Sequence, residues 1–277
     1  MIGMTILIIL GSRDADFEFG EKVGIIEISG VITDAKKAIY NLKRFREDNS
    51  IKAIVIRIDS PGGAVGPSQE IYREIRKTSS SKKVVASMGT IAASGGYYIA
   101  AGTDGIIANR GTITGSIGVI MGFTNYQELL RKIGLVPVVV KSGEFKDLGS
   151  PVREMKTEEK KFLKDFAAKI HRQFIMDIVE GRSMKKAEVE SLADGRIFTG
   201  EESKELGLID RIGNFEDAVE WAGRMGGIKG KISTVYARER KYSFLKYIAD
   251  SSIKNLLSRI IHPFLSADYL YNPEKEI

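Results

Sequence analysis

The sequence predicts an α/β fold with a mostly parallel sheet. Between Val23 and Val140, short runs rich in valine and isoleucine alternate with segments whose apolar residues recur every three or four positions. Strands that are apolar on both faces are typical of parallel sheets, because helices cover both sides of such a sheet. A long helix and a tail with a helical pattern follow, and 277 residues are enough for one large domain with an appendage.

The elements of this sheet are expected in alternating order along the chain. Apolar runs typical of strands occupy residues 23–32, 51–59, 83–89, 104–110, 115–121 and 136–140. Patterns that predict helices lie between them, at residues 34–48, 67–77 and 126–134. Pro67 is expected to open the second of these helices, because proline fits the first turn of a helix.

A long helix is expected from Thr157 to Gly181, because its apolar residues repeat every four positions. This stripe consists of Phe162, Phe166, Ile170, Phe174 and Ile178. Packing against the core and contact with another subunit both explain such a stripe. His171 lies one position off the stripe, so we interpret it as a flanking residue and not as a ligand.

The two ends of the chain differ in character from its middle. Residues 1–22 begin with MIGMTILIIL, which is too short to cross a bilayer, since a spanning helix needs about 20 apolar residues. This segment is interpreted either as the remnant of a membrane anchor or as an edge strand. Residues 226–277 form an amphipathic tail that fits a docking or oligomer helix, or a helix at a membrane surface. Residues 23–225 remain as the main domain.

Composition excludes several classes of function. The chain has no cysteine, which rules out disulfides, thiolate metal sites and a cysteine nucleophile. The net charge of +6 is dispersed and no nucleic-acid-binding signature is present, so no nucleic-acid partner is expected. We also expect neither a metal nor a cofactor.

Ser94 lies in the stretch TIAASGGYYIAAG, among small and apolar residues and directly before two glycines. Such a serine can cap a buried helix, because its oxygen accepts a hydrogen bond from a free backbone amide. It can equally be a nucleophile on a sharply bent backbone that lets a substrate approach closely. This stretch alone does not distinguish the two interpretations.

A nucleophilic serine needs a base, and the sequence favours a lysine. Neither of the two histidines, His171 and His262, stands at the end of a strand in the α/β region. A lysine base must be uncharged, so it must be shielded from water. Lys141 and Lys146 both follow an apolar run at a place where α/β proteins form their sites, and spacing does not choose between them.

An oxyanion hole is the remaining requirement of such a site, because backbone amides must face the charge that develops on the substrate. The stretch DSPGG, at residues 59–63, ends a predicted strand with two glycines. Glycine permits the backbone angles that turn amides outward. Gly62 and Gly63 are therefore candidates for this role.

Five stretches together resemble the signal peptide peptidase A family of serine peptidases, whose core is related to ClpP and the crotonases. They are DSPGG at 59–63, SMGTIAASGGYYIA at 87–100, TITGSIGVIM at 112–121, KSGEFKD at 141–147 and ADGRIFTGEESKELGLID at 193–210. Their order and spacing match the family over about residues 23–220, a combination far more specific than any one stretch. The resemblance implies a ClpP/crotonase-like fold.

The resemblance also assigns roles to individual residues. Ser94 matches the family's nucleophile and Lys146 its general base, which selects Lys146 over Lys141. Ser116 matches a second serine that holds the lysine amine in place. Gly63 matches the oxyanion-hole glycine, and Gly95 is a candidate for a further amide.

Partners and location are likewise implied by the resemblance. We expect apolar peptide substrates such as cleaved signal peptides, and a homo-oligomer in which serine and lysine meet across a subunit boundary. We expect association with the membrane and a catalytic domain on its extracytoplasmic side. Two alternatives stay open: a non-catalytic scaffold of the same fold, and a crotonase-like acyl-CoA enzyme that would need no serine-lysine pair.

Overall fold

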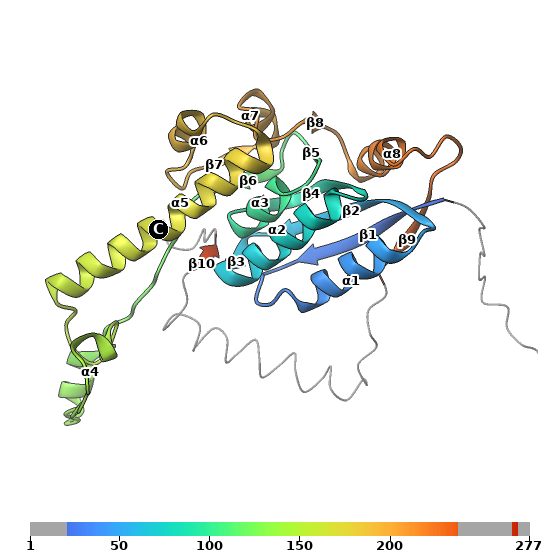
Figure 1. Ribbon diagram of the computed structural model, residues 1–277. Coiled ribbons are helices and arrows are strands. Elements are labelled where there is room, and N and C mark those ends of the chain that lie inside the picture. The colour runs from blue at the N-terminus through green and yellow to red at the C-terminus, as the bar shows by residue number, and fades with distance from the viewer. Residues whose placement is uncertain (1–20, 238–267, 271–277) are drawn as a thin grey trace, which may run out of the picture.

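The computed structural model describes residues 21–237 and 268–270, and it confirms an α/β protein built on a mostly parallel sheet (Figure 1). The strands are β1 (Lys22–Ser29), β2 (Ile51–Ser60), β3 (Gly62–Ala64), β4 (Lys83–Ala93), β5 (Gly105–Ala108), β6 (Ile113–Gly115), β7 (Ile197–Thr199), β8 (Arg211–Ile212), β9 (Ser233–Tyr236) and β10 (Asp268–Leu270). The helices are α1 (Lys36–Glu47), α2 (Val65–Ser79), α3 (Gly95–Ala101), α4 (Gln127–Lys132), α5 (Thr157–Arg182), α6 (Lys186–Leu192), α7 (Gly200–Glu205) and α8 (Phe215–Met225), with one 3₁₀ helix, η1 (Glu144–Asp147).

The main sheet has the strand order β7-β6-β4-β2-β1-β9, and β5 pairs with both β4 and β8. Every described pair in this sheet is parallel except β6 with β7. The small strands β3 and β10 form a separate antiparallel pair. Parallel neighbours require crossover connections, which the helices between the strands provide.

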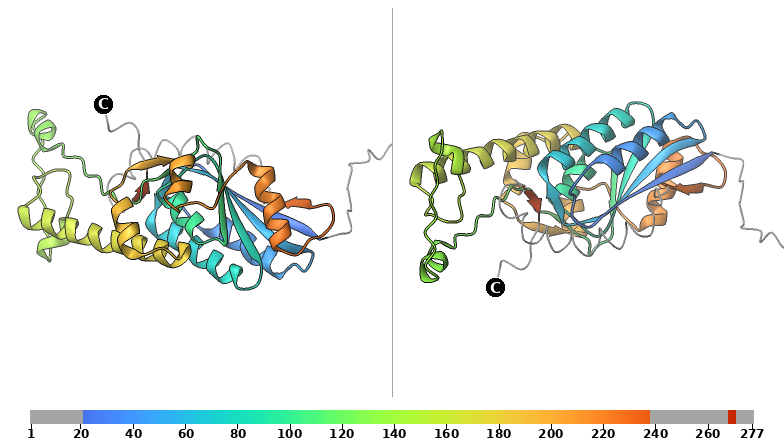
Figure 2. Two further views of the ribbon diagram at one scale, coloured as in Figure 1. Left: turned by 90° about the horizontal axis from the view of Figure 1, so that it is seen from above. Right: turned by 90° about the horizontal axis from the view of Figure 1, so that it is seen from below.

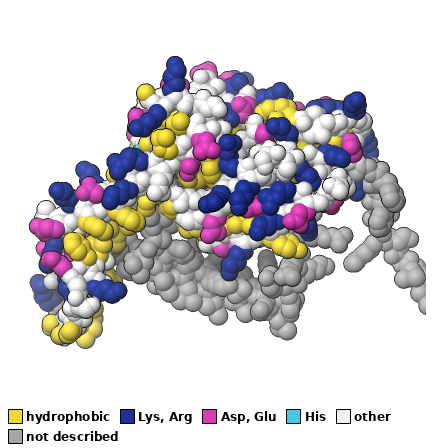
Figure 3. Space-filling model, in the orientation of Figure 1, with side chains coloured by type: hydrophobic (Ala, Val, Ile, Leu, Met, Phe, Trp, Pro, Cys, Tyr) yellow, Lys and Arg dark blue, Asp and Glu magenta, His cyan; other side chains and the backbone are white. Residues whose placement is uncertain are grey.

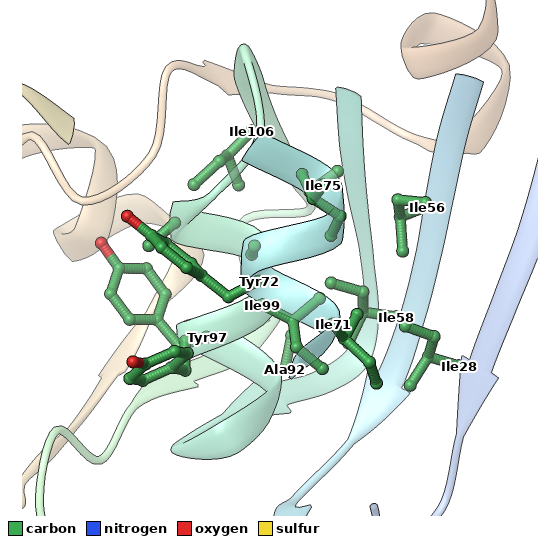
Figure 4. Close-up of a cluster of buried hydrophobic side chains, with 14 of the residues drawn as sticks. Ile28, Ile56, Ile58, Ile71, Tyr72, Ile75, Ala92, Tyr97, Ile99 and Ile106 are labelled. Carbon is green, nitrogen blue, oxygen red and sulfur yellow. The ribbon is translucent and has the colours of Figure 1, made fainter. Parts of the chain in front are cut away.

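Both faces of the central strands are buried, as their continuous apolar sequences predict. Ile54 and Ile56 of β2 belong to one core cluster, whereas Ala53 and Val55, which alternate with them, belong to another. Helices α1, α2 and α3 pack on the first face, and α8 packs on the second. Figure 4 shows the first cluster, in which isoleucines of the sheet meet those of α2 and α3.

A projecting arm extends beyond the edge of the sheet (Figures 1 and 2). It consists of residues 122–156 and the N-terminal half of α5. The predicted apolar stripe on α5 is buried in one half of the helix and exposed in the other. Phe174 and Ile178 are fully buried and pack in the core, whereas Phe162 and Phe166 are 48% and 43% exposed on the arm.

The arm also explains a prediction that is wrong. Residues 136–140 were expected to form a strand, but they have no regular secondary structure. Val136, Val138 and Val140 are strongly exposed, and within the described residues no strand pairs with this segment. A strand needs a neighbour for its backbone hydrogen bonds, and the projecting arm offers none. The strand expected at 115–121 is also misplaced, because β6 ends at Gly115.

Several expectations about the ends of the chain lie outside the described residues. These include the apolar start at 1–10, the amphipathic pattern at 244–261, and His262. Within the described part, β9 adds a strand beside β1, at the edge of the main sheet. No helix in the described part is both long and apolar enough to cross a membrane.

Candidate active site

Ser94 lies in a strained turn between β4 and α3. Its φ of 53° and ψ of −115° are unusual for any residue with a side chain, and it is 1% exposed. The Ser94 amide donates to the Gly115 carbonyl at 2.8 Å, and the Tyr98 amide donates to the Ser94 carbonyl at 2.8 Å. Serine therefore occupies the N-cap position of α3, but its side chain makes no capping hydrogen bond. A strained strand-to-helix turn, in which the serine hydroxyl has no hydrogen-bond partner among the described residues, fits a nucleophile better than a cap.

Gly63 and Gly95 are brought together beside Ser94. A methyl group on Gly95 would lie 2.7 Å from the Ser68 Oγ and 3.2 Å from the Gly63 nitrogen. A methyl group on Gly63 would lie only 2.2 Å from the Ile32 carbonyl oxygen. Gly63 therefore requires glycine for lack of space, and Gly95 leaves little room for a side chain. The Gly63 amide is next to the residue that follows the candidate nucleophile. This arrangement is suited to an oxyanion hole.

The edge of β3 that carries the Gly63 amide follows from its neighbours. The Ile32 amide donates to the Gly62 carbonyl, and the Ala64 amide donates to the Ile32 carbonyl, each at 2.8 Å. Successive residues of a strand direct their N–H and C=O groups to opposite edges. The polar groups of Gly63 therefore face away from Ile32, toward the other edge of β3.

Ser116 lies next to Ser94 through strand pairing. Ala93 is the register partner of Gly115, so the two serines directly follow paired residues of β4 and β6. Ser116 is 8% exposed and has a φ of 50°, and its amide donates to the Arg196 carbonyl at 2.8 Å. The structure thus brings together Ser94, Ser116, Gly63 and Gly95.

Lys146 is not part of this group within one chain. It lies on η1 in the arm, which leads away from the sheet (Figure 1), and its side chain is exposed. The neighbouring Phe145 contacts Phe162, in the exposed half of α5, with ring centroids 5.4 Å apart. Among the described residues, none forms a hydrogen bond or an ion pair with the Lys146 amine. A lysine base needs shielding from water, and the described residues of one chain leave the Lys146 side chain exposed.

Lys141, the other candidate base, is committed to an ion pair. Its amine donates to Asp147 Oδ1 at 2.5 Å and to the Glu144 carbonyl at 2.8 Å. These contacts fix the turn that carries Lys146. Lys141 thus has partners within its own turn, whereas the choice of Lys146 as the base rests on the resemblance.

Arg153 connects the same turn to the start of α5, a feature that the sequence did not reveal. Its guanidinium donates to Asp147 Oδ2 at 2.8 Å and to Glu159 Oε1 at 2.5 Å, and Glu159 is 1% exposed. Hydrogen bonds from Arg153 and then from Lys141 hold the pKa of Asp147 well below its usual range. The bond from Arg153 lowers the pKa of Glu159 to about 2. The sequence signal for this cluster is the acidic first turn of α5, because a buried carboxylate there needs a cationic partner.

A surface hollow in the described part of the molecule lies elsewhere. It has a volume of about 510 Å³ and includes neither Ser94 nor Gly63. It lies between α2 and α5 and is lined by Gln69, Lys169, Arg172, Gln173, Met176 and Asp177. Backbone strain, close packing and oriented amides occur together at Ser94 instead, so the candidate active site lies at Ser94. The described residues contain no cluster suited to a metal ion.

Comparison with known proteins identifies the family. The model of peptidase family S49 matches residues 76–229, and the model of Clp protease matches residues 21–114. The chain belongs to peptidase family S49. It is a serine peptidase with a ClpP-like core, and both matched regions include Ser94 and Gly95.

Individual relatives of the peptidase agree with this assignment. It is 45% identical to a protein of Synechocystis sp. that bears a protease name, over 75% of this chain and 76% of the relative. It is 38% identical to an Enterococcus faecium protein that bears the name signal peptide peptidase SppA, over 72% of this chain and 62% of that protein. It is 35% identical to the chloroplastic serine protease SPPA of Arabidopsis thaliana, over 74% of this chain and 30% of that protein.

Proposed function

We propose that this peptidase hydrolyses peptide bonds with a Ser94-Lys146 dyad that forms only when two copies of the chain meet. One observation carries the proposal. Ser94 is buried and strained beside Ser116 and Gly63 in the body, whereas Lys146 is exposed on an arm that leads away from it. A neighbouring copy whose arm reaches this site would complete it.

The reaction follows from the groups that would then meet. The Ser94 Oγ attacks the peptide carbonyl while its proton passes to the neutral Lys146 amine. The amides of Gly63 and Gly95 stabilise the negative oxygen. The C–N bond breaks as the lysine returns the proton to the leaving amine, and water then hydrolyses the acyl-enzyme in the same way. The Ser116 hydroxyl orients the lysine amine.

The surface of the arm supports assembly into a homo-oligomer. Figure 3 shows hydrophobic side chains gathered on its surface. They include Leu129, Ile133, Leu135, Val136, Val138, Val140, Phe162 and Phe166, each more than two-fifths exposed. Contiguous exposed apolar side chains of this kind mark interaction sites. Covering them with a second copy would also remove water from around Lys146, as its role as a base requires.

The substrates we propose are apolar peptides, cleaved signal peptides among them. The name of the Enterococcus faecium relative supports this class. The apolar start at residues 1–10 and the amphipathic pattern at 244–261 support association with a membrane. We place the catalytic domain on the extracytoplasmic side, where removed signal peptides would be met.

Complementation tests the shared dyad. Ser94→Ala and Lys146→Ala proteins should each be inactive on a fluorogenic apolar peptide, and mixing them should restore part of the activity. Recovery is expected because some boundaries pair an intact serine with an intact lysine. Lys132→Ala, which changes another exposed lysine of the same arm, is the matched control and should retain activity.

Two results would reject the proposal. Lys146→Ala with wild-type activity would remove the lysine from the mechanism. No recovery in a mixed assembly, verified by mass, would place both groups in one chain. Labelling of Ser94 by a serine-directed acylating probe separates the peptidase from a scaffold or an acyl-CoA enzyme, neither of which predicts it.

A further inference from the structure

Asp147, which directly follows Lys146 on η1, is held at both its side chain and its backbone. The Arg153 Nε donates to Asp147 Oδ2 at 2.8 Å, and the Arg153 Nη2 donates to Asp147 Oδ1 at 2.9 Å. The same Nη2 donates to the Asp147 carbonyl oxygen at 3.2 Å. A guanidinium that binds a carboxylate through two nitrogens fixes its orientation as well as its distance. One arginine therefore sets the position of the residue next to the candidate base.

Arg153 is in turn fixed to the first turn of α5. Its Nη1 donates to Glu159 Oε2 at 2.8 Å, and its Nη2 donates to Glu159 Oε1 at 2.5 Å. Glu159 is buried and also accepts a hydrogen bond from the Lys156 amide at 2.8 Å, so its own position is closely defined. The far half of α5 packs in the core, where Phe174 is fully buried. A continuous helix of 26 residues thus connects η1 to the body of the molecule.

Lys141 adds a second cation to the same carboxylate. Its amine donates to Asp147 Oδ1 at 2.5 Å and to the Glu144 carbonyl oxygen at 2.8 Å. Lys141 precedes η1 in the sequence and Arg153 follows it, so Asp147 joins the two ends of the turn. An isolated ion pair in water holds little, but this one is bidentate, belongs to a network, and leaves the Asp147 side chain only 13% exposed.

Lys146 needs such support because its own side chain has none. Among the described residues, its amine has no partner, and lysine carries its charge on a flexible stem of four carbons. The backbone of η1 therefore decides which points the amine can reach. A displacement of about 1 Å in a reacting group costs about a hundredfold in rate. A turn that is free to move would rarely hold the amine at the hydroxyl of Ser94.

We propose that Arg153 and Asp147 are positioning residues that hold Lys146 in place for the Ser94 hydroxyl of a neighbouring copy. The inference rests on the proposed dyad. Neither residue touches the reacting atoms, and both act through the backbone of η1. Their loss should therefore lower kcat and leave KM unchanged, because other groups of the site bind the peptide.

A spin label at the base tests the positioning directly. The chain contains no cysteine, so Lys146→Cys provides a single thiol for a nitroxide, whose electron paramagnetic resonance spectrum reports the motion of η1 without any turnover. Adding Asp147→Ala should shorten the rotational correlation time severalfold, because the bonds to Arg153 and Lys141 are lost. Asp165→Ala, which changes an exposed aspartate of α5 on the same arm, is the matched control and should leave the spectrum unchanged. The same spectrum in all three labelled proteins would overturn the inference.

Hydrolysis of an apolar peptide tests the catalytic consequence. Asp147→Ala should lower kcat by roughly ten- to a hundredfold at unchanged KM. Arg153→Lys should do the same, because lysine keeps the charge of arginine but lacks its fork of donors. Asp165→Ala should keep both constants. Rates are compared where every variant is folded and equally assembled, as judged by thermal unfolding and by mass. Wild-type kcat in Asp147→Ala and Arg153→Lys, or a rise in KM alone, would overturn the inference.

The two measurements separate this inference from the proposed dyad. Wild-type activity in Lys146→Ala would reject the dyad, whatever the label reports. An inactive Lys146→Ala protein, together with a label that Asp147→Ala does not mobilise, would keep the dyad and overturn the positioning role.

Discussion

Gly63→Ala is expected to disable the candidate oxyanion hole. The added Cβ would lie 2.2 Å from the Ile32 carbonyl oxygen and 2.5 Å from the Ile32 nitrogen. Both are backbone atoms, so no side-chain rotation relieves the contact. Because carbon atoms pack at about 3.5–4.0 Å, β3 would have to move away from Ile32 by roughly 1 Å.

The cost follows from that displacement. The two hydrogen bonds between Ile32 and β3, each 2.8 Å long, would be stretched together. Overpacking of this kind destabilises a protein by about 1–3 kcal/mol. The Gly63 amide would move with its strand, and loss of one oxyanion donor lowers kcat by about 10²–10³. We therefore expect a folded protein with a moderately lower Tm and at least a hundredfold lower kcat.

Gly66→Ala is the matched control, three residues along the chain in the first turn of α2. A Cβ at Gly66 meets no atom within 4 Å. Alanine also favours a helix over glycine by up to about 1 kcal/mol, so this variant should melt at the same temperature or higher and keep its activity. Peptide hydrolysis and thermal unfolding of the two variants are compared side by side. Wild-type kcat in a well-folded Gly63→Ala protein would refute the role of this amide.

Three further changes probe the site and the arm. Ser116→Ala should lower activity far less than Ser94→Ala, because it removes one orienting hydrogen bond worth about 0.5–1.5 kcal/mol; an equal loss in peptide hydrolysis would show that the attacking serine is misassigned. Arg153→Met should lower the free energy of unfolding by about 3 kcal/mol. This is the lower end of the range for a broken buried ion pair, because the Arg153 side chain is 25% exposed. Urea unfolding measures the change, with Arg172→Met, which alters an exposed arginine, as the control. The lowered pKa of Glu159, about 2 against 4.5, contributes stability that is present above pH 4.5 and lost as the pH falls toward 2. Wild type should therefore lose Tm more steeply over that range than Glu159→Gln, and parallel curves would contradict the ion pair.

The sequence was informative wherever local pattern and burial agree. The apolar run of β2 predicts a strand covered on both faces, and α1 and α8 pack on it as expected. Motifs made Ser94, Ser116 and Gly63 candidates, and the register of β4 with β6 and the closeness of Gly95 to Gly63 bring these candidates together.

The arm could not be predicted in the same way. Residues 136–140 have the composition of a strand, but composition does not show whether a partner strand is present. The apolar stripe on α5 likewise continues without a break from buried Phe174 to exposed Phe162. The same periodic pattern fits a helix in a core and a helix on a contact surface, so it does not show where burial ends. Tail pairing with β3 depends on contacts between residues far apart in the sequence, which periodicity does not report.

The separation of Lys146 from Ser94 has a consequence for the cell that makes this peptidase. Under the proposed dyad, a newly made chain carries a nucleophile and a base that cannot act on each other, so a solitary copy digests nothing around it. Activity would then grow more steeply than concentration until assembly is complete, since every working site needs two chains. The arm would serve as a safeguard, confining proteolysis to places where copies accumulate.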